Sequence, residues 1–165
     1  MELIKFNQKM IDQASQWAND LGGIKNSITK GRGNLAGRLG EIALAGHLSA
    51  GVQDHREYDL VYKGRSIEVK TKRRTVAPRA HYEVSVAKTS KHQHPDLYAF
   101  ISMEFDRKEN GSYFGLKNIW LCGYSDDYFK KAKHMKKGDR DESNGFTTLV
   151  DMYNLRIDQL DQNIL

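Results

Sequence analysis

The chain has 165 residues, enough for a single domain that buries about 70% of the surface its unfolded chain would expose, so its core needs no disulfide or metal staple. Its residues are 39% hydrophobic and 28% charged, a composition that excludes intrinsic disorder and indicates a packed globular protein. The 26 basic and 21 acidic residues give a formal charge of +5, which suits a polyanionic partner.

Cysteine usage and hydropathy bear on where the protein works. Cys122 is the one cysteine of the chain, so no intrachain disulfide can form and a reducing, intracellular setting is expected. No apolar stretch approaches the roughly 20 residues that cross a bilayer, and the residues from Met1 to Asn7 lack the layout of a signal peptide. The sequence therefore predicts a cytoplasmic protein with no membrane partner.

Two periodicities distinguish helices from strands along the chain. Apolar residues at steps of three and four predict a helix, and alternation or a short apolar run between turn residues predicts a strand. In chain order the predicted elements are a helix from Asn7 to Leu21, a loop over 24–34, a helix over 35–48, strands over 58–62, 66–71 and 82–87, a short helical connection over 88–95, strands over 97–103 and 118–124, a helix starting at 125–127, a strand over 146–152 and a short turn or helix over 157–160.

The order of these elements predicts an α/β fold with a central mixed β-sheet flanked by helices. No internal repeat, low-complexity tract or shift in composition divides the chain. We therefore expect one domain over 1–165, in which 1–34 form an N-terminal helix and loop, 35–103 the catalytic core, and 104–165 a C-terminal appendage of strand and helix.

The strand predicted over 66–71 carries an acid and an amine on one face. Side chains alternate along a strand, so Glu68 and Lys70 point the same way, about 7 Å apart at ~3.3 Å per residue. Asp59 lies on the preceding strand, and a tight turn at Gly64 would pair the two strands and bring Asp59 towards Glu68. The sequence thus predicts that two carboxylates and a lysine converge.

The predicted meeting of two carboxylates indicates a bound metal ion. Ionised carboxylates at close range repel each other, and a divalent cation relieves that repulsion while taking the oxygen ligands it prefers. We expect Mg²⁺, with Mn²⁺ as a substitute, held by Asp59 and Glu68. Such an ion polarises a phosphoryl oxygen and lowers the pKa of a bound water, while Lys70 positions the water or neutralises developing charge. This chemistry favours phosphodiester hydrolysis.

Three segments together resemble the active site of the PD-(D/E)XK nuclease superfamily: Gly37-Arg38-Leu39-Gly40-Glu41, Tyr58-Asp59-Leu60 and Ile67-Glu68-Val69-Lys70. The resemblance implies a restriction-endonuclease-like core with the order helix, three strands, helix, strand (αβββαβ). Asp59 and Glu68 would then bind the metal together with the backbone carbonyl of Val69. Lys70 would act on the nucleophilic water, and Glu41 on the helix would complete the metal shell.

Two positions depart from the pattern of the superfamily. Tyr58 stands where many members have a proline before the first acid. Gln93 and Tyr98 are one residue too far apart for the Gln-x-x-x-Tyr element of RecB-like members. The resemblance therefore does not assign the chain to that branch.

Basic residues gather near the predicted site. Taken alone, such clusters are more often solvated faces than binding sites, but beside a carboxylate site they favour contacts with phosphates. The expected contacts with DNA lie directly after the predicted strand and in the loop before the predicted helix: Lys72, Arg73, Arg74, Lys30 and Arg32.

The residues favour a Mg²⁺-dependent deoxyribonuclease, either an endonuclease or a structure-selective nuclease, with DNA as its partner. One alternative is a catalytically inactive nucleic-acid-binding module with the same fold. Another is a structural or nucleotide-processing protein in which Asp59, Glu68 and Lys70 form a salt-bridge network on a surface hairpin. Cutting both strands of a duplex usually needs two active sites, so the assembly is left open between a monomer and a homodimer.

Overall fold

The protein is a mixed α/β fold with two β-sheets, as a computed structural model shows for residues 1–21, 34–109, 113–141 and 145–163. Its elements are, in chain order, β1 (Glu2–Ile4), α1 (Gln8–Leu21), α2 (Asn34–Leu48), β2 (Leu60–Tyr62), β3 (Arg65–Arg74), β4 (Glu83–Ala87), the 3-10 helix η1 (Lys88–His92), β5 (Leu97–Arg107), β6 (Tyr113–Ser125), α3 (Tyr128–Lys131), β7 (Lys133–Met135), β8 (Met152–Arg156) and the 3-10 helix η2 (Ile157–Gln159). No helix in these described ranges is long and apolar enough to span a membrane.

The larger sheet has five strands in the order β1-β6-β5-β3-β2. β3 and β5 run parallel, from Ile67 opposite Leu97 to Arg74 opposite Glu104, and the other neighbours are antiparallel. Parallel strands need a crossover connection, which here contains β4 and η1. The mixed sheet confirms the α/β class expected from the sequence.

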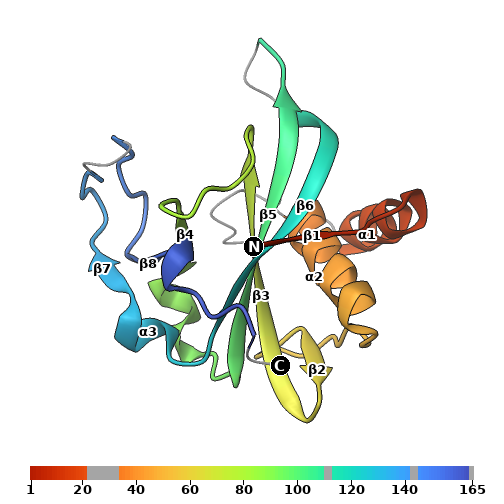
Figure 1. Ribbon diagram of the computed structural model, residues 1–165, viewed down its shortest axis with the longest axis horizontal. Helices are drawn as coiled ribbons and strands as arrows, with labels where there is room; N and C mark the ends of the chain where they lie inside the picture. The colour runs from red at the N-terminus through yellow and green to blue at the C-terminus, as the bar shows by residue number, and fades with distance from the viewer. Residues whose placement is uncertain (22–33, 110–112, 142–144, 164–165) are drawn as a thin grey trace.

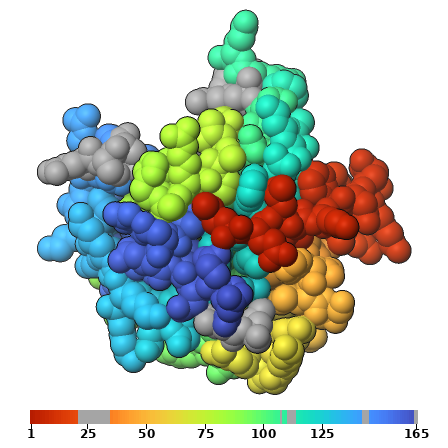
Figure 2. Space-filling view, in the orientation of Figure 1, coloured from red at the N-terminus to blue at the C-terminus, as the bar shows by residue number. Residues whose placement is uncertain are grey.

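Each face of the five-stranded sheet is covered by a different layer (Figure 1). On one face lie α1 and α2, and Leu44 of α2 shares a hydrophobic core with Ile67 of β3. The smaller sheet, of order β4-β8-β7, covers the other face, where Val86 of β4 shares a second core with Phe100 of β5. Figure 2 shows the same division on the surface, with α1 in red and the C-terminal segment in blue on opposite sides. Burial of side chains this large contributes roughly 1.5–3 kcal/mol each.

The expected order of helix, three strands, helix and strand is present along the chain, but its third strand lies in the other sheet. β4 pairs antiparallel with β8 rather than joining β3. The expected helical connection is a 3-10 helix of five residues, Lys88–His92, which ends before Pro95. β1 and β7 were not expected, because strands of three residues are too short to show an alternating pattern.

The last strand expected from the sequence is wrong. The pattern places it over 146–152, whereas β8 covers Met152–Arg156. Phe146 and Leu149, whose apolar character suggested the strand, are 50% and 64% exposed, so they do not form a buried strand face. The segment is instead a loop, in which the Thr148 N–H donates to the Asp139 carbonyl at 2.9 Å.

Candidate active site

A tight hairpin brings the strand after Asp59 against β3. Tyr62 pairs with Arg65, which leaves a two-residue turn at Lys63 and Gly64. Both turn residues have positive φ, 49° and 78°, as in the hairpin turns whose twist matches that of the flanking strands. The hairpin expected from Gly64 is therefore present, and Asp59 lies immediately before β2.

Asp59 occupies the edge of β3 where pairing with β2 ends. The last register pair is Leu60 opposite Ile67, and the Asp59 N–H donates to the Ile67 carbonyl at 2.9 Å. Further along β3, the Oδ2 of Asp59 accepts a hydrogen bond from the Val69 N–H at 2.7 Å. The N–H and C=O of one strand residue point to the same edge, so the Val69 carbonyl lies on the edge that Asp59 occupies.

Glu68 and Lys70 lie on one face of β3, as strand alternation predicts. Their side chains are in direct contact, with Lys70 Nζ donating to Glu68 Oε1 at 2.6 Å. Glu68 is only 6% exposed, so one end of this ion pair is largely removed from water. Replacing one member of such a pair destabilises the protein, because the other member remains as a buried and uncompensated charge.

Close contact between α2 and β3 brings Glu41 to the same region. Gly40 lies against Thr71, and a Cβ on Gly40 would come 2.1 Å from the Thr71 hydroxyl oxygen, so glycine permits this approach. Glu41 follows it on the helix, partly buried, and its Oε2 accepts a hydrogen bond from Arg38 Nη1 at 3.0 Å. Arg38 also forms an ion pair with Asp54 at 3.2 Å.

The three carboxyl groups lie within electrostatic reach of one another. Desolvation raises the pKa of Asp59, and the neighbouring Glu41 and Glu68 raise it further, to about 8. Desolvation also raises the pKa of Glu41, while Arg38 lowers it and Glu68 raises it again. Negative charge is therefore crowded at this edge of β3, which favours a proton or a bound cation. We call Glu41, Asp59 and Glu68 the carboxylate cluster.

Gln93 belongs to the site, although the sequence did not predict it. Its Nε2 donates to Glu68 Oε1 at 3.1 Å, and its Oε1 accepts a hydrogen bond from Lys70 Nζ at 3.3 Å. One amide thus bridges both members of the ion pair, and it also donates to the Arg56 carbonyl at 3.3 Å. The sequence signal for Gln93 is its nearness to Tyr98, which lies opposite Glu68 in the parallel strand pair, but the spacing of the two residues does not match the Gln-x-x-x-Tyr element.

The basic residues expected to contact DNA do not share one face. Lys72 Nζ and Arg74 Nη2 lie on the face of Lys70, and both donate to the backbone carbonyl of Glu83, at 3.2 and 2.9 Å. Arg73 lies on the opposite face of β3, beside α1 and α2. Two further expected contacts lie outside the described residues: Lys30 and Arg32.

The carboxylate oxygens of the cluster are of the kind that a hard divalent cation takes as ligands. Mg²⁺ and Mn²⁺ prefer carboxylate and carbonyl oxygens, and the raised pKa of Asp59 indicates a place where positive charge is stabilised. In the described part of the chain, no three His, Cys, Asp or Glu side chains form an arrangement that could hold a metal ion. The cluster carboxylates instead accept hydrogen bonds from protein donors.

No known protein family, curated protein or solved structure matches this chain. Its function therefore has to be inferred from the chemistry of the site. The residues that carry this inference are Glu41, Asp59, Glu68, Lys70 and Gln93.

Proposed function

We propose that the protein is a metal-dependent nuclease that hydrolyses phosphodiester bonds of DNA with Mg²⁺, or with Mn²⁺ in its place. The observation that carries the proposal is the meeting of Glu41, Asp59 and Glu68 beside Lys70 at the open edge of β3. A structural salt-bridge network would balance acids with bases. Among the described residues that interact here, acids outnumber bases: Glu41, Asp54, Asp59 and Glu68 are set against Arg38 and Lys70.

Each residue of the site has a role in this proposal. Asp59, Glu68 and the backbone carbonyl of Val69 would hold the metal, and Glu41 would complete its shell. The bound ion would supply Lewis acidity to a phosphoryl oxygen and acidify a water. Lys70, exchanging its bond with Glu68 for one to the water or the phosphate, would orient the nucleophile and offset developing negative charge.

We also propose that the core is of the restriction-endonuclease-like type. α2, β2, β3 and β5 follow one another in the expected order. Glu41 lies on α2, Asp59 directly precedes β2, and Glu68 lies on β3. The parallel alignment of β3 with β5 agrees with a mixed sheet that has a crossover after the catalytic strand. Because β4 lies in the second sheet, this part of the proposal depends on the other four elements.

Cleavage of a supercoiled plasmid and of a branched DNA, with and without Mg²⁺, tests the function. Wild-type protein should cut in Mg²⁺ only, and Lys70→Ala should not cut. Lys117→Ala is a matched control, because the Lys117 ammonium also bonds a carboxylate, Asp106 Oδ1 at 2.5 Å, on the β5–β6 hairpin. Absence of cleavage by the wild type, or equal cleavage by Lys70→Ala, would contradict the proposal.

One observation favours the second candidate, a nucleic-acid-binding module without catalysis. The cluster carboxylates bond protein donors, and within the described ranges they do not form a metal-holding group. Such a module would bind DNA equally well with and without divalent metal. Its affinity would also be unchanged by Asp59→Asn, whereas a nuclease should lose cleavage and keep or gain affinity when this negative charge is removed.

A further inference from the structure

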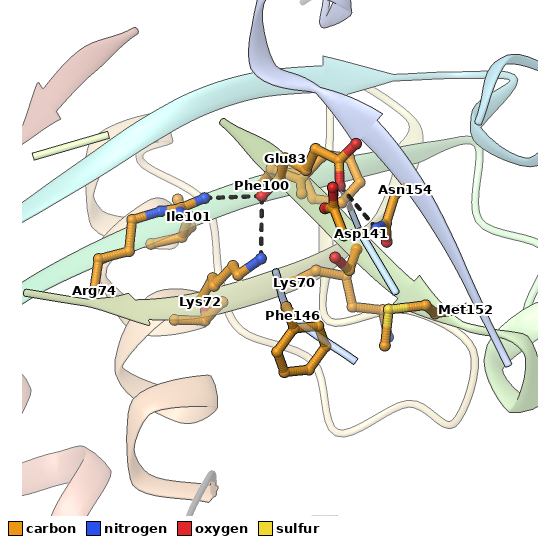
Figure 3. A pocket seen from close by; sticks show the side chains of 13 residues that line it. Lys70, Lys72, Arg74, Glu83, Phe100, Ile101, Asp141, Phe146, Met152 and Asn154 are labelled. Carbon is orange, nitrogen blue, oxygen red and sulfur yellow. Dashed lines mark hydrogen bonds between the residues drawn. The ribbon is translucent and has the colours of Figure 1, made fainter. Parts of the chain in front are cut away.

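A cavity of about 460 Å³ lies beside the carboxylate cluster, between the two sheets (Figure 3). It begins at Lys70 and continues along the same face of β3 past Lys72 and Arg74. Strands β4, β5 and β8, together with Asp141 and Phe146, form its other walls. Its volume is within the range of about 300–1,000 Å³ that is usual for sites that bind small molecules.

The walls of the cavity differ in chemistry from one side to the other. The β3 wall is cationic, with three basic side chains in a row: Lys70, Lys72 and Arg74. On the side of β4 and β8, which we call the polar end, Asn154 Nδ2 donates to Glu83 Oε2 at 2.8 Å, and Asp141 also hydrogen-bonds to Glu83. Apolar and aromatic side chains also line the cavity: Phe100, Phe146 and Met152. A nucleotide carries groups that match all three: an anionic phosphate, a planar apolar face and a polar edge.

The polar end of the cavity contains an acceptor without a donor. Asn154 is 7% exposed, and its Oδ1 is buried with no hydrogen-bond partner among the described residues. Buried polar atoms are normally hydrogen-bonded, so this oxygen points to a donor that a ligand would bring. The carboxyl groups of Glu83 and Asp141 beside it make this end rich in acceptors, and desolvation together with Asp141 raises the pKa of Glu83.

We infer, on the basis of the nuclease function proposed above, that the cavity receives one unpaired nucleotide of the DNA strand next to the bond that is cut. Its phosphate lies at Lys70 and Lys72, its base stacks on Phe146, and the edge of the base reaches Asn154. A base inside a stacked duplex cannot enter such a pocket, because it must first leave the stack. The substrate class is therefore DNA with a single-stranded segment, such as a flap, a junction or a free strand.

The chemistry of the polar end also selects the base. Acceptors on Glu83 and Asn154 suit bases that carry an exocyclic amino group, which adenine, cytosine and guanine have and thymine lacks. Stacking on an aromatic ring favours any base, and its loss lowers affinity by about tenfold or more. The cavity should thus bind oligo-dA and oligo-dC more tightly than oligo-dT.

Binding of labelled 12-nucleotide strands of dA, dC and dT tests this inference, measured by fluorescence anisotropy in Ca²⁺ with strand integrity checked on gels. Wild-type protein should bind dA and dC about tenfold more tightly than dT. Phe146→Ala should weaken dA and dC binding about tenfold. Phe114→Ala is the matched control, since Phe114 is 45% exposed on β6, outside the cavity, and Phe146 is 50% exposed, so neither change should unfold the protein.

Equal affinity for the three strands, or equal behaviour of Phe146→Ala and Phe114→Ala, would overturn the inference. If plasmid cleavage persisted in that case, the nuclease function would stand and only the role of the cavity would fall. A base preference that depends on Phe146 would support the cavity even in protein that cuts no DNA, and the proposed nuclease function alone would then be contradicted.

Discussion

Two groups of acids lie beside the row of cations on β3: the carboxylate cluster, and Glu83 with Asp141 in the cavity. The two regions differ in the groups that the cations bond. In the carboxylate cluster, Lys70 bonds the carboxylate of Glu68 itself. In the cavity, Lys72 and Arg74 bond the backbone carbonyl of Glu83, while the Glu83 carboxylate accepts from Asn154. A carbonyl dipole offsets a positive charge less than a carboxylate does, so Arg74 keeps more of its attraction for a phosphate, whereas Lys72 also interacts with the charges of Glu83 and Asp141. In the functions proposed above, the first region would hold the metal and the second would hold the nucleotide.

The largest effect should come from the carboxylate cluster. Asp59→Asn and Glu68→Gln should each lower the rate of DNA cleavage by about a thousandfold, because a catalytic metal contributes several kcal/mol of transition-state stabilisation. Asp106→Asn, which removes a carboxylate of the β5–β6 hairpin, should change the rate by about twofold at most. Rates are measured under single-turnover conditions, and an equal loss in the three variants would show that the carboxylate cluster has no special role in cleavage.

An intermediate effect should come from Gln93, which bonds Glu68 and Lys70 without reaching the proposed substrate. Gln93→Leu should lower kcat by about ten to a hundredfold and leave KM nearly unchanged, as for residues that orient metal ligands. Gln8→Leu is the matched control, because the Gln8 amide bonds Asp12 at 2.8 Å on α1, away from the site. A change in KM alone would show that Gln93 belongs to the binding region instead.

The last effect concerns stability without metal and not the rate of cleavage. The pKa of Asp59 is raised to about 8, so the folded protein binds a proton that the unfolded chain releases near pH 4. The contribution of Asp59 to stability in EDTA should therefore be greatest below about pH 4 and fall as the pH rises towards 8. The slope is at most about 1.4 kcal/mol per pH unit, and it is smaller because the carboxyl is partly exposed. Urea unfolding measures the slope.

Two comparisons make this stability measurement specific to the cluster. Asp59→Asn should flatten the pH slope, since an amide does not titrate. Mg²⁺ at pH 8 should restore stability to the wild type and not to Asp59→Asn, because a ligand that binds only the folded state stabilises it. Stability that rose with pH over this window in the wild type, or the same slope in both proteins, would contradict crowding of negative charge at Asp59.

The parts of the site that the sequence predicts are those set by short-range rules. Alternation along β3 places Glu68 with Lys70, and the turn at Gly64 brings Asp59 to the same edge. Glu41 needed more, because its place depends on the close packing of Gly40 against Thr71. That contact lies between elements far apart in the sequence. Only the resemblance to a nuclease family pointed to Glu41.

The parts that the sequence could not predict depend on long-range pairing. Gln93 reaches the ion pair because the chain leaves η1 in an extended conformation, which a fixed spacing to Tyr98 does not describe. The pairing of β4 with β8 joins residues far apart in the sequence, such as Val84 and Leu155, and no local pattern encodes it. The cavity arises from that pairing, so the basic residues after Lys70 could be expected to bind phosphate but not to line a cavity between two sheets.

The most direct test of the proposed metal site is a crystal structure of the protein with Mn²⁺ and an anomalous difference map. We expect a peak at the open edge of β3, with oxygens of Asp59 and Glu68 and the carbonyl of Val69 at about 2.0–2.2 Å from the ion. A peak between Glu83 and Asp141 instead, or none at the carboxylate cluster at saturating Mn²⁺, would contradict the assignment of the cluster as the catalytic metal site.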